Sequence, residues 1–152
     1  MDRPEIDKLI SRLRDLARLQ GTRAERARAA AGMLRVTRPY RWVGLYDVNE
    51  EEIAVIAWHG PEPPTYPRFP VTQGLNGAAV ASKRPVIAQD VTADPRYLAT
   101  IGGTRGEMIY PILRSTRVVG TIDVEIDKVN AFTSEDDVLL AACAEALIWL
   151  WT

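Results

Sequence analysis

The sequence predicts an α/β domain of the α+β kind, with a central, antiparallel-rich sheet between helices at the two ends of the chain. Apolar residues recur every three or four positions in the first 34 residues and again after residue 133, which is the period of an amphipathic helix. Apolar and polar residues alternate over residues 41–58 and 106–127, which is the period of half-buried strands. We therefore expect the terminal helices on one face of the sheet, and short helices and loops on the other.

Two helices are expected at the N-terminal end of the chain. Pro4 suits the first turn of a helix, and the apolar residues from 6 to 17 follow the i, i+3, i+4 spacing. Gly21 interrupts this spacing, and Thr22 can cap a second helix that ends at about Leu34. Small residues dominate the narrow apolar stripe of the second helix: Ala27, Ala30, Ala31 and Leu34. Such a stripe allows close packing on either the sheet or a partner chain.

The chain divides into a helical region, residues 1–35, and the domain itself, residues 36–152. The helical region is expected to pack on the domain or on a dimer partner. Two tryptophans near the C-terminus, Trp149 and Trp151, are expected to be buried against the N-terminal helix or a second subunit. Together with the small-residue stripe, they predict a homodimer through the terminal helices.

The middle of the chain is predicted to alternate between strands and short helices. Residues 41–47 and 53–58 form a hairpin, and the prolines of residues 61–67 force an irregular loop. The expected elements beyond this loop are a strand at 69–71, a helix at 75–82, a strand at 85–90 and one or two helical turns at 96–101. A second hairpin follows at 106–127 with a polar turn at 114–117, and Thr133 or Ser134 caps a final helix.

Composition and charge exclude several classes of protein. With 152 residues, 47% of them hydrophobic, the chain can fold around its own core without a metal or a disulfide. The single cysteine excludes an intrachain disulfide, and a net charge of −1 gives no general attraction to nucleic acid or membranes. No apolar run reaches the roughly 18 residues of a membrane-spanning helix, and the N-terminal residues lack the apolar block of a signal peptide. We expect a cytoplasmic protein without cofactor, nucleic-acid partner or membrane partner.

Charge is distributed unevenly along the chain. Residues 1–41 hold 11 Lys and Arg against 5 Asp and Glu, whereas residues 119–152 hold 1 against 7. The basic stretch lacks the interleaved aromatic residues of a nucleic-acid interface. We therefore expect the basic and acidic ends to lie near each other, within one chain or across a dimer.

Carboxylates form the first group of candidate site residues. Alternation in the strand after residue 117 places Thr121, Asp123, Glu125 and Asp127 on one face, and Glu107 stands near the start of the neighbouring strand. These side chains are either solvated strand-face charges or the floor of a pocket for an amine or another cation. In a pocket without a ligand they repel one another, so one carboxyl should have a raised pKa.

Aromatic residues form the second group. Trp42 and Tyr46 share one face of a strand, so both are either core residues or walls that contact an apolar or cationic ligand. Tyr66 stands in the proline-rich loop. His59 is the only histidine and has no cysteine or second histidine beside it, so we expect no metal site.

Several motifs taken together resemble those of the GAF domain family. They are RWVGLY at 41–46, GLNGAA at 74–79, PVIAQDV at 85–91, EMIYP at 107–111, VGTIDV at 119–124 and FTSED at 132–136. The resemblance covers roughly residues 30–150. It implies the GAF fold, in which one face of the sheet holds a small-molecule pocket.

Within that family, the motifs resemble the free methionine-(R)-sulfoxide reductase branch. Its W-x-G-F-Y, E-I-x-x-P and G-x-L-D-I-D strands are matched by the segments that begin at Trp42, Glu107 and Gly120. The resemblance implies that Glu107, Asp123 and Glu125 help to hold a free amino acid; Glu125 stands where the family has Asp.

The sequence departs from that branch at the cysteines with which those enzymes reduce their substrate. The matching positions are about Tyr66, Asn76 and Thr100, none of which forms a thiolate. Cys143 lies on the apolar stripe of the last helix, where we expect a buried and inert thiol. The resemblance thus implies no catalytic residue and a ligand-binding set of Trp42, Tyr46, Tyr66, Asn76, Thr100, Glu107, Asp123 and Glu125.

Three classes of function stay open. The leading hypothesis is a non-catalytic sensor module for signalling that binds a small molecule with an amino group. The second is a residual enzyme of the reductase type, in which the carboxylates carry acid–base chemistry. The third is a protein-interaction module that dimerises and whose pocket is vestigial.

Overall fold

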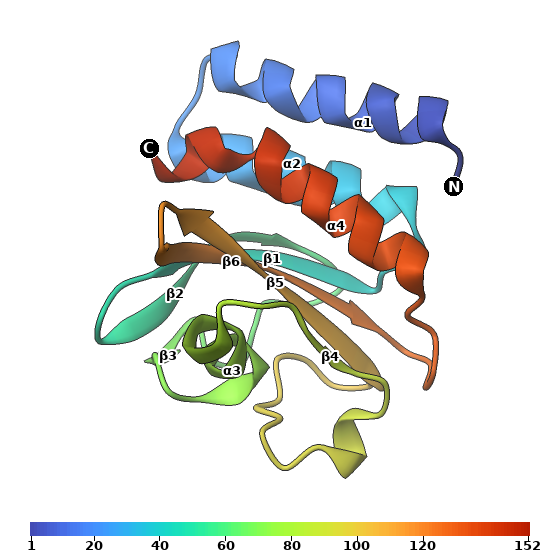
Figure 1. The fold of residues 1–152 in the computed structure, drawn as a ribbon, viewed down its shortest axis with the longest axis vertical. Helices are drawn as coiled ribbons and strands as arrows, with labels where there is room; N and C mark the ends of the chain where they lie inside the picture. Colours follow the sequence, from blue (N-terminus) through green and yellow to red (C-terminus); the bar gives the residue numbers. More distant parts are fainter.

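The computed structural model describes residues 1–152 as one six-stranded antiparallel sheet with helices on both faces (Figure 1). The strands lie in the order β3-β2-β1-β6-β5-β4, and every neighbouring pair is antiparallel. Their bounds are β1 (Trp42–Val48), β2 (Glu52–His59), β3 (Arg68–Pro70), β4 (Val86–Ala88), β5 (Gly106–Arg114) and β6 (Arg117–Ile126). This architecture is the predicted fold class.

The terminal helices cover one face of the sheet, and the short helix α3 lies on the other (Figure 1). The α-helices are α1 (Arg3–Asp15), α2 (Arg23–Thr37), α3 (Gly74–Ser82) and α4 (Ser134–Ala146). Short 3-10 helices are η1 (Leu16–Arg18), η2 (Val91–Ala93) and η3 (Ile148–Trp151). The helix α1 forms an outer layer on α2 and α4, which themselves rest on the sheet (Figure 1). No helix is both long enough and apolar enough to cross a membrane.

Capping boxes begin all three long helices. Thr22 and Thr133, both expected as caps, accept backbone N–H bonds from Glu25 and Glu135, while the acidic residue at the third helical position bonds back to the cap. Asp2 does the same for α1. Local sequence signals therefore fix where these helices start.

The main core lies between the terminal helices and the sheet. The small-residue stripe of α2 is fully buried there and packs against the chain's own strands β1 and β2. Trp151 is also buried, and its indole N–H donates to the carbonyl of Tyr46 at 3.1 Å. Val43 and Leu45 belong to this core, whereas Trp42 and Tyr46 point to the opposite face, as the alternation of β1 predicts.

The basic and acidic ends of the chain meet within one chain. The guanidinium of Arg38 lies 2.8 Å from Glu135 and 3.3 Å from Asp136, at the start of α4. Tyr40 adds a hydrogen bond of 2.6 Å from its hydroxyl to Asp136. Of the two predicted arrangements, within one chain or across a dimer, the structure therefore contains the contact within one chain.

Three local predictions are wrong. Residues 96–101 form no helical turns, because Asp94 closes a tight turn on Arg96 and Tyr97, and the chain then runs on as a loop to β5. The predicted strand at 85–90 is shortened to β4, since η2 begins directly after Asp90 caps it. Asp127 was expected on the same strand face as Asp123 and Glu125. However, β6 ends at Ile126, so Asp127 lies beyond the strand and is exposed.

Candidate functional site

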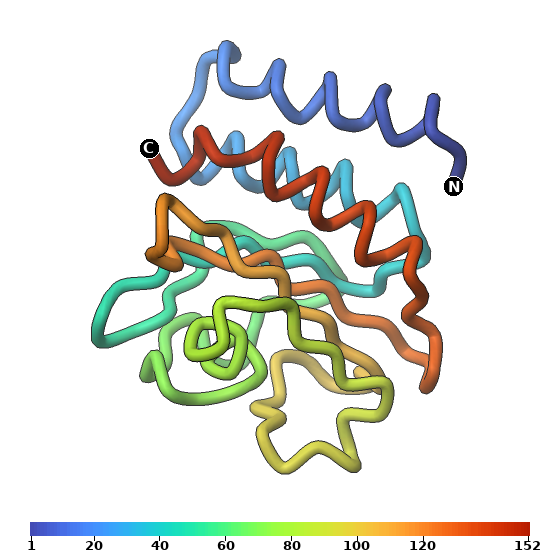
Figure 2. The backbone as a smooth tube through the Cα atoms, in the orientation of Figure 1, coloured from blue at the N-terminus to red at the C-terminus, as the bar shows by residue number.

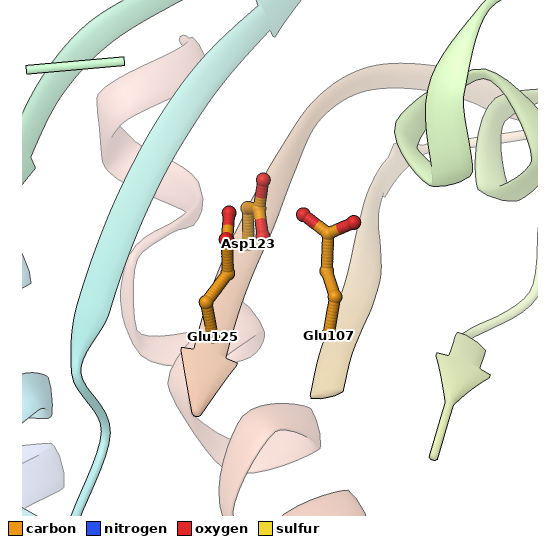
Figure 3. A group of neighbouring side chains, drawn as sticks. All are labelled: Glu107, Asp123 and Glu125. Carbon is orange, nitrogen blue, oxygen red and sulfur yellow. The ribbon is translucent and has the colours of Figure 1, made fainter. Parts of the chain in front are cut away.

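Three carboxylates meet on the face of the sheet opposite the terminal helices. Glu107 on β5 is directly paired with Glu125 on β6, and Asp123 lies two residues before Glu125 on the same face. One carboxyl oxygen from each residue lies within 4.8 Å of the others, and Figure 3 shows the three groups turned toward a common point. The exposed fractions of Glu107, Asp123 and Glu125 are 2%, 0% and 0%, so these side chains are not solvated surface charges. We call these three residues the carboxylate cluster.

Neutral side chains donate hydrogen bonds to two of the carboxyl oxygens of the cluster. Asn76 on α3 donates its amide to Asp123 Oδ2 at 3.1 Å, and Thr121 donates its hydroxyl to Asn76 Oδ1 at 2.5 Å. Thr104 donates to Glu125 Oε1 at 2.7 Å. The second oxygens of these two carboxylates, Asp123 Oδ1 and Glu125 Oε2, are buried and have no hydrogen-bond partner. A buried polar atom without a partner costs free energy, which a ligand with donors can recover.

No positive side chain balances the cluster. Every ion pair of the structure involves other carboxylates. Burial, and then the charges of its two neighbours, raise the pKa of Glu107 well above its ordinary value, and burial and Glu125 do the same to the pKa of Asp123. Burial also raises the pKa of Glu125. The predicted raised carboxyl pKa is thus present.

A nearly closed cavity adjoins the cluster. Its free volume is about 10 Å³, close to the space of one water molecule. Residues from β1, β5, α3 and two loops line it, among them Tyr46, Tyr66, Asn76, Thr100 and Glu107. Of the cluster, only Glu107 lines the cavity itself, and Asp123 is connected to it through Asn76.

Two loops close the cavity from outside. The proline-rich loop before β3 and the loop before β5 are joined where Thr65 donates its backbone N–H and its hydroxyl to the carbonyl of Thr100, at 2.8 and 3.0 Å. A second link runs from the N–H of Gly102 to Glu62 at 3.0 Å. Figure 2 shows the loop before β5, in yellow, beside α3 on the face away from the terminal helices. A ligand larger than water therefore needs more space than the cavity between these loops provides.

The predicted aromatic residues take different places. Tyr46 is buried in the cavity wall, and Tyr66 stands at the rim with 47% of its surface exposed. Trp42 does not line this cavity; it stacks on Trp58 with ring centroids 6.5 Å apart and donates its indole N–H to the carbonyl of Glu62. Trp42 is thus placed to support Tyr46 and the proline-rich loop.

Sequence reasoning missed several residues of the site. Thr104 carries the hydrogen bond to Glu125, and Phe69, Leu75 and Leu98 line the cavity. Leu75 belongs to the GLNGAA motif, which marked this segment. Thr104 and Leu98 lie in an irregular loop. Because such a loop has no helical or strand periodicity, its sequence does not predict which side chains point inward.

Cys143 lies far from this chemistry. It belongs to the core between α4 and the sheet, on the face opposite the carboxylate cluster, and is fully buried as predicted. Burial raises the pKa of its thiol to about 12, so the thiolate is scarce at neutral pH.

An antiparallel sheet with terminal helices on one face and a small, nearly closed cavity on the other is an architecture typical of ligand-binding, sensor-type domains. A family model described as the GAF domain matches residues 23–147. The chain therefore belongs to the GAF domain family, as its motifs indicated.

Individual relatives include both GAF proteins and reductases. GAF domain-containing protein A of Dictyostelium discoideum is 29% identical over 107 residues, which cover 70% of this chain and 66% of that protein. The structure of the type II free methionine-R-sulfoxide reductase from Thermoplasma acidophilum matches with a TM-score of 0.78 and 28% identity, over 91% of this chain and 94% of that one. The free methionine-R-sulfoxide reductase from Neisseria meningitidis, in complex with its substrate, has a TM-score of 0.85 at 21% identity, covers 99% of this chain and 92% of that one, and supports the fold alone.

Proposed function

We propose that this GAF domain binds a small molecule through an ammonium group held by Glu107, Asp123 and Glu125, and that it does so as a non-catalytic sensor module. The observation that carries the proposal is a buried carboxylate cluster with two unpartnered oxygens and no positive side chain. A primary ammonium group supplies three N–H donors and one positive charge. Since the three carboxylates are buried, both the hydrogen bonds and the charge attraction are strengthened there.

The start of α3 supports a zwitterionic ligand. Gly74 and Leu75 line the cavity, and no side chain caps this helix. The free N–H groups of a helix N-terminus attract an anion, so the carboxylate of a free amino acid would fit there while its ammonium group meets the cluster. The Thermoplasma relative, a reductase of free methionine-R-sulfoxide by its name, is consistent with this class of ligand.

The lack of a thiol at the cavity supports a non-catalytic role. Tyr66, Asn76 and Thr100 lie at the cavity and carry no sulfur, and the only cysteine is buried on the other face. Reduction of a sulfoxide by a thiol requires a thiolate in contact with the sulfur. The carboxylates alone can move protons but supply no electrons.

Dimerisation and a cytoplasmic location stay predictions. The small-residue stripe and Trp151, which suggested a dimer, are buried within this chain. Other apolar side chains remain exposed on the terminal helices, most of all Val36 on α2 with 79% exposed. Light scattering across a range of concentrations would decide between a monomer and a homodimer.

A thermal-shift panel tests the proposal. It should contain free amino acids, their sulfoxides, small alkylamines and cyclic nucleotides. A ligand at 100 times its Kd stabilises the folded state by about 2.7 kcal/mol, which shifts Tm by several degrees. We expect amines to give the shift, Asp123→Asn to remove it, and Asp127→Asn, an exposed change four residues along the chain, to leave it intact. A panel without any shift would favour the vestigial pocket, and turnover of a sulfoxide would favour the residual enzyme.

A further inference from the structure

We infer that the empty pocket holds a proton shared among Glu107, Asp123 and Glu125, and that the ammonium group of the ligand displaces this proton when it enters. The ammonium part of this inference rests on the proposed function. The shared proton concerns the empty protein and is testable without any ligand.

The backbone keeps the three carboxyl groups together. Glu107 and Glu125 are a directly paired cross-strand couple of β5 and β6, and Asp123 follows the same face of β6. The three side chains are almost completely buried, and their oxygens lie within 4.8 Å of one another. Because both strands are interior strands of the sheet, the groups cannot separate to relieve their repulsion. Three negative charges at this spacing need a positive charge or a proton.

The elements packed around the cluster provide no positive charge. Asn76 comes from α3 and Tyr46 from β1, while Tyr97, Thr100 and Thr104 come from the loop before β5. Burial raises the pKa of both tyrosines, so they stay neutral. The guanidinium of Arg41 is engaged by the carbonyl of Gly102 at the outer loop instead. A proton on one of the three carboxyl groups would supply the counter-charge that these elements lack.

A proton on one carboxyl group also provides a hydrogen-bond donor for an oxygen of the cluster that lacks one. Asp123 Oδ1 and Glu125 Oε2 have no donor in the structure, and Glu107 lies within hydrogen-bonding reach of both residues. An O–H on one carboxyl group gives a partner to an oxygen that otherwise has none. An ammonium group does the same with three donors and adds its charge, so the two occupants replace each other.

The exchange of one proton for one ammonium group predicts how the affinity for the ligand depends on pH. One ammonium group enters, one carboxyl O–H bond breaks, and one proton leaves to the solvent. By linkage, the affinity for the amine should rise about tenfold per pH unit over the range in which the empty site holds the proton. A neutral ligand that accepts a hydrogen bond from the carboxyl O–H would show the opposite dependence, because it needs the proton to stay.

The first experiment measures the proton in the ligand-free protein. Carbon-13 NMR would follow the carboxyl carbons of the cluster through a pH titration, with signals assigned by Glu107→Gln and Asp123→Asn. We expect at least one of the three carbons to keep its protonated chemical shift after the exposed carboxyls of the chain have titrated. Titration of all three together with the exposed carboxyls would overturn the inference and leave the proposed amine binding standing.

The second experiment measures the exchange with methylammonium as the probe. Calorimetric titrations at several pH values, each in two buffers of different ionisation enthalpy, give the affinity and the number of protons released. We expect release of about one proton and the tenfold slope, both unchanged in Asp127→Asn. Binding without release, or affinity that falls as pH rises, would overturn the inference but not the ligand site. No binding at any pH, with the carbons still protonated, would instead overturn the proposed function and the exchange together.

Discussion

The amide of Asn76 donates to the carboxylate of Asp123 at 3.1 Å and so joins α3 to β6 at the floor of the pocket. Both residues are buried, and Thr121 completes the link by donating to the same amide. This contact fixes the helix whose N-terminus lines the cavity. The same hydrogen bond lowers the pKa of Asp123 and so opposes part of the increase that burial causes.

Removal of this amide should destabilise the fold measurably. Asn76→Ala leaves Asp123 and Thr121 buried without their partner, which should lower the free energy of unfolding by about 1–3 kcal/mol. Urea denaturation followed by circular dichroism measures the loss. Gln73→Ala is the matched control, since Gln73 is exposed at the same end of α3 and makes no capping bond. An equal loss in both variants would show that the Asn76 contact has no particular importance.

Stability of the empty protein should decrease as pH rises. Because burial raises the folded-state pKa of Glu107 and Asp123, the folded chain keeps protons that the unfolded chain loses above about pH 4–5. The resulting stability is full below that range and is lost as pH rises through the folded-state pKa, at about 1.4 kcal/mol per pH unit for each proton retained. Glu107→Gln should flatten this decline at pH values above the unfolded-state pKa, and Glu51→Gln, at an exposed turn, should not. Identical slopes in both variants would contradict the account of the cluster.

Gly120 should tolerate no side chain. A Cβ atom there would lie 2.1 Å from the indole nitrogen of Trp151 and 2.7 Å from the carbonyl of Tyr46, and these two groups are hydrogen-bonded to each other. We expect Gly120→Ala to cost about 1–3 kcal/mol of stability through overpacking and to change the tryptophan fluorescence. Gly102→Ala, where the nearest atom is 3.8 Å away, should have little effect. Full stability of Gly120→Ala would mean that Trp151 is not held where the structure has it.

Cys143 should be inert in the folded protein. Because the thiol is buried and its pKa is about 12, a thiol reagent should react with it only after unfolding. With a dithiol reductant, consumption of free methionine-(R)-sulfoxide should equal the protein-free blank. Turnover that disappears in Cys143→Ala would show that this cysteine is catalytic and that the non-catalytic proposal is wrong.

Local patterns in the sequence were sufficient for most of the fold. The alternation around Asp123 and Glu125 predicts that they share a face, and the capping residues Thr22 and Thr133 mark the helix starts. Beyond the turn that Asp94 closes, the path of the loop before β5 depends on Thr100, whose carbonyl is bound by Thr65 from a loop 35 residues earlier. Local periodicity contains no such long-range contact.

The candidate site was predictable to the same extent. Regular strands bring Glu107 beside Glu125, so the cluster follows from strand pairing once the hairpin is recognised. Thr104 could not be identified, because its contact with Glu125 depends on the irregular loop before β5. The closure of the cavity was likewise outside local reasoning, since it results from two loops that meet through Glu62 and Gly102.

In the proposed complex, an ammonium group of the ligand contacts the carboxylate cluster. The most direct test is a thermodynamic cycle by calorimetry, in which the amine with the largest thermal shift and its hydroxyl analogue each bind the original protein and Asp123→Asn. We predict that replacing the ammonium group weakens binding to the original protein far more than to the variant, with a coupling of about 0.5–3 kcal/mol. If the two changes are additive, the ammonium group does not contact Asp123, and the account of this pocket is wrong.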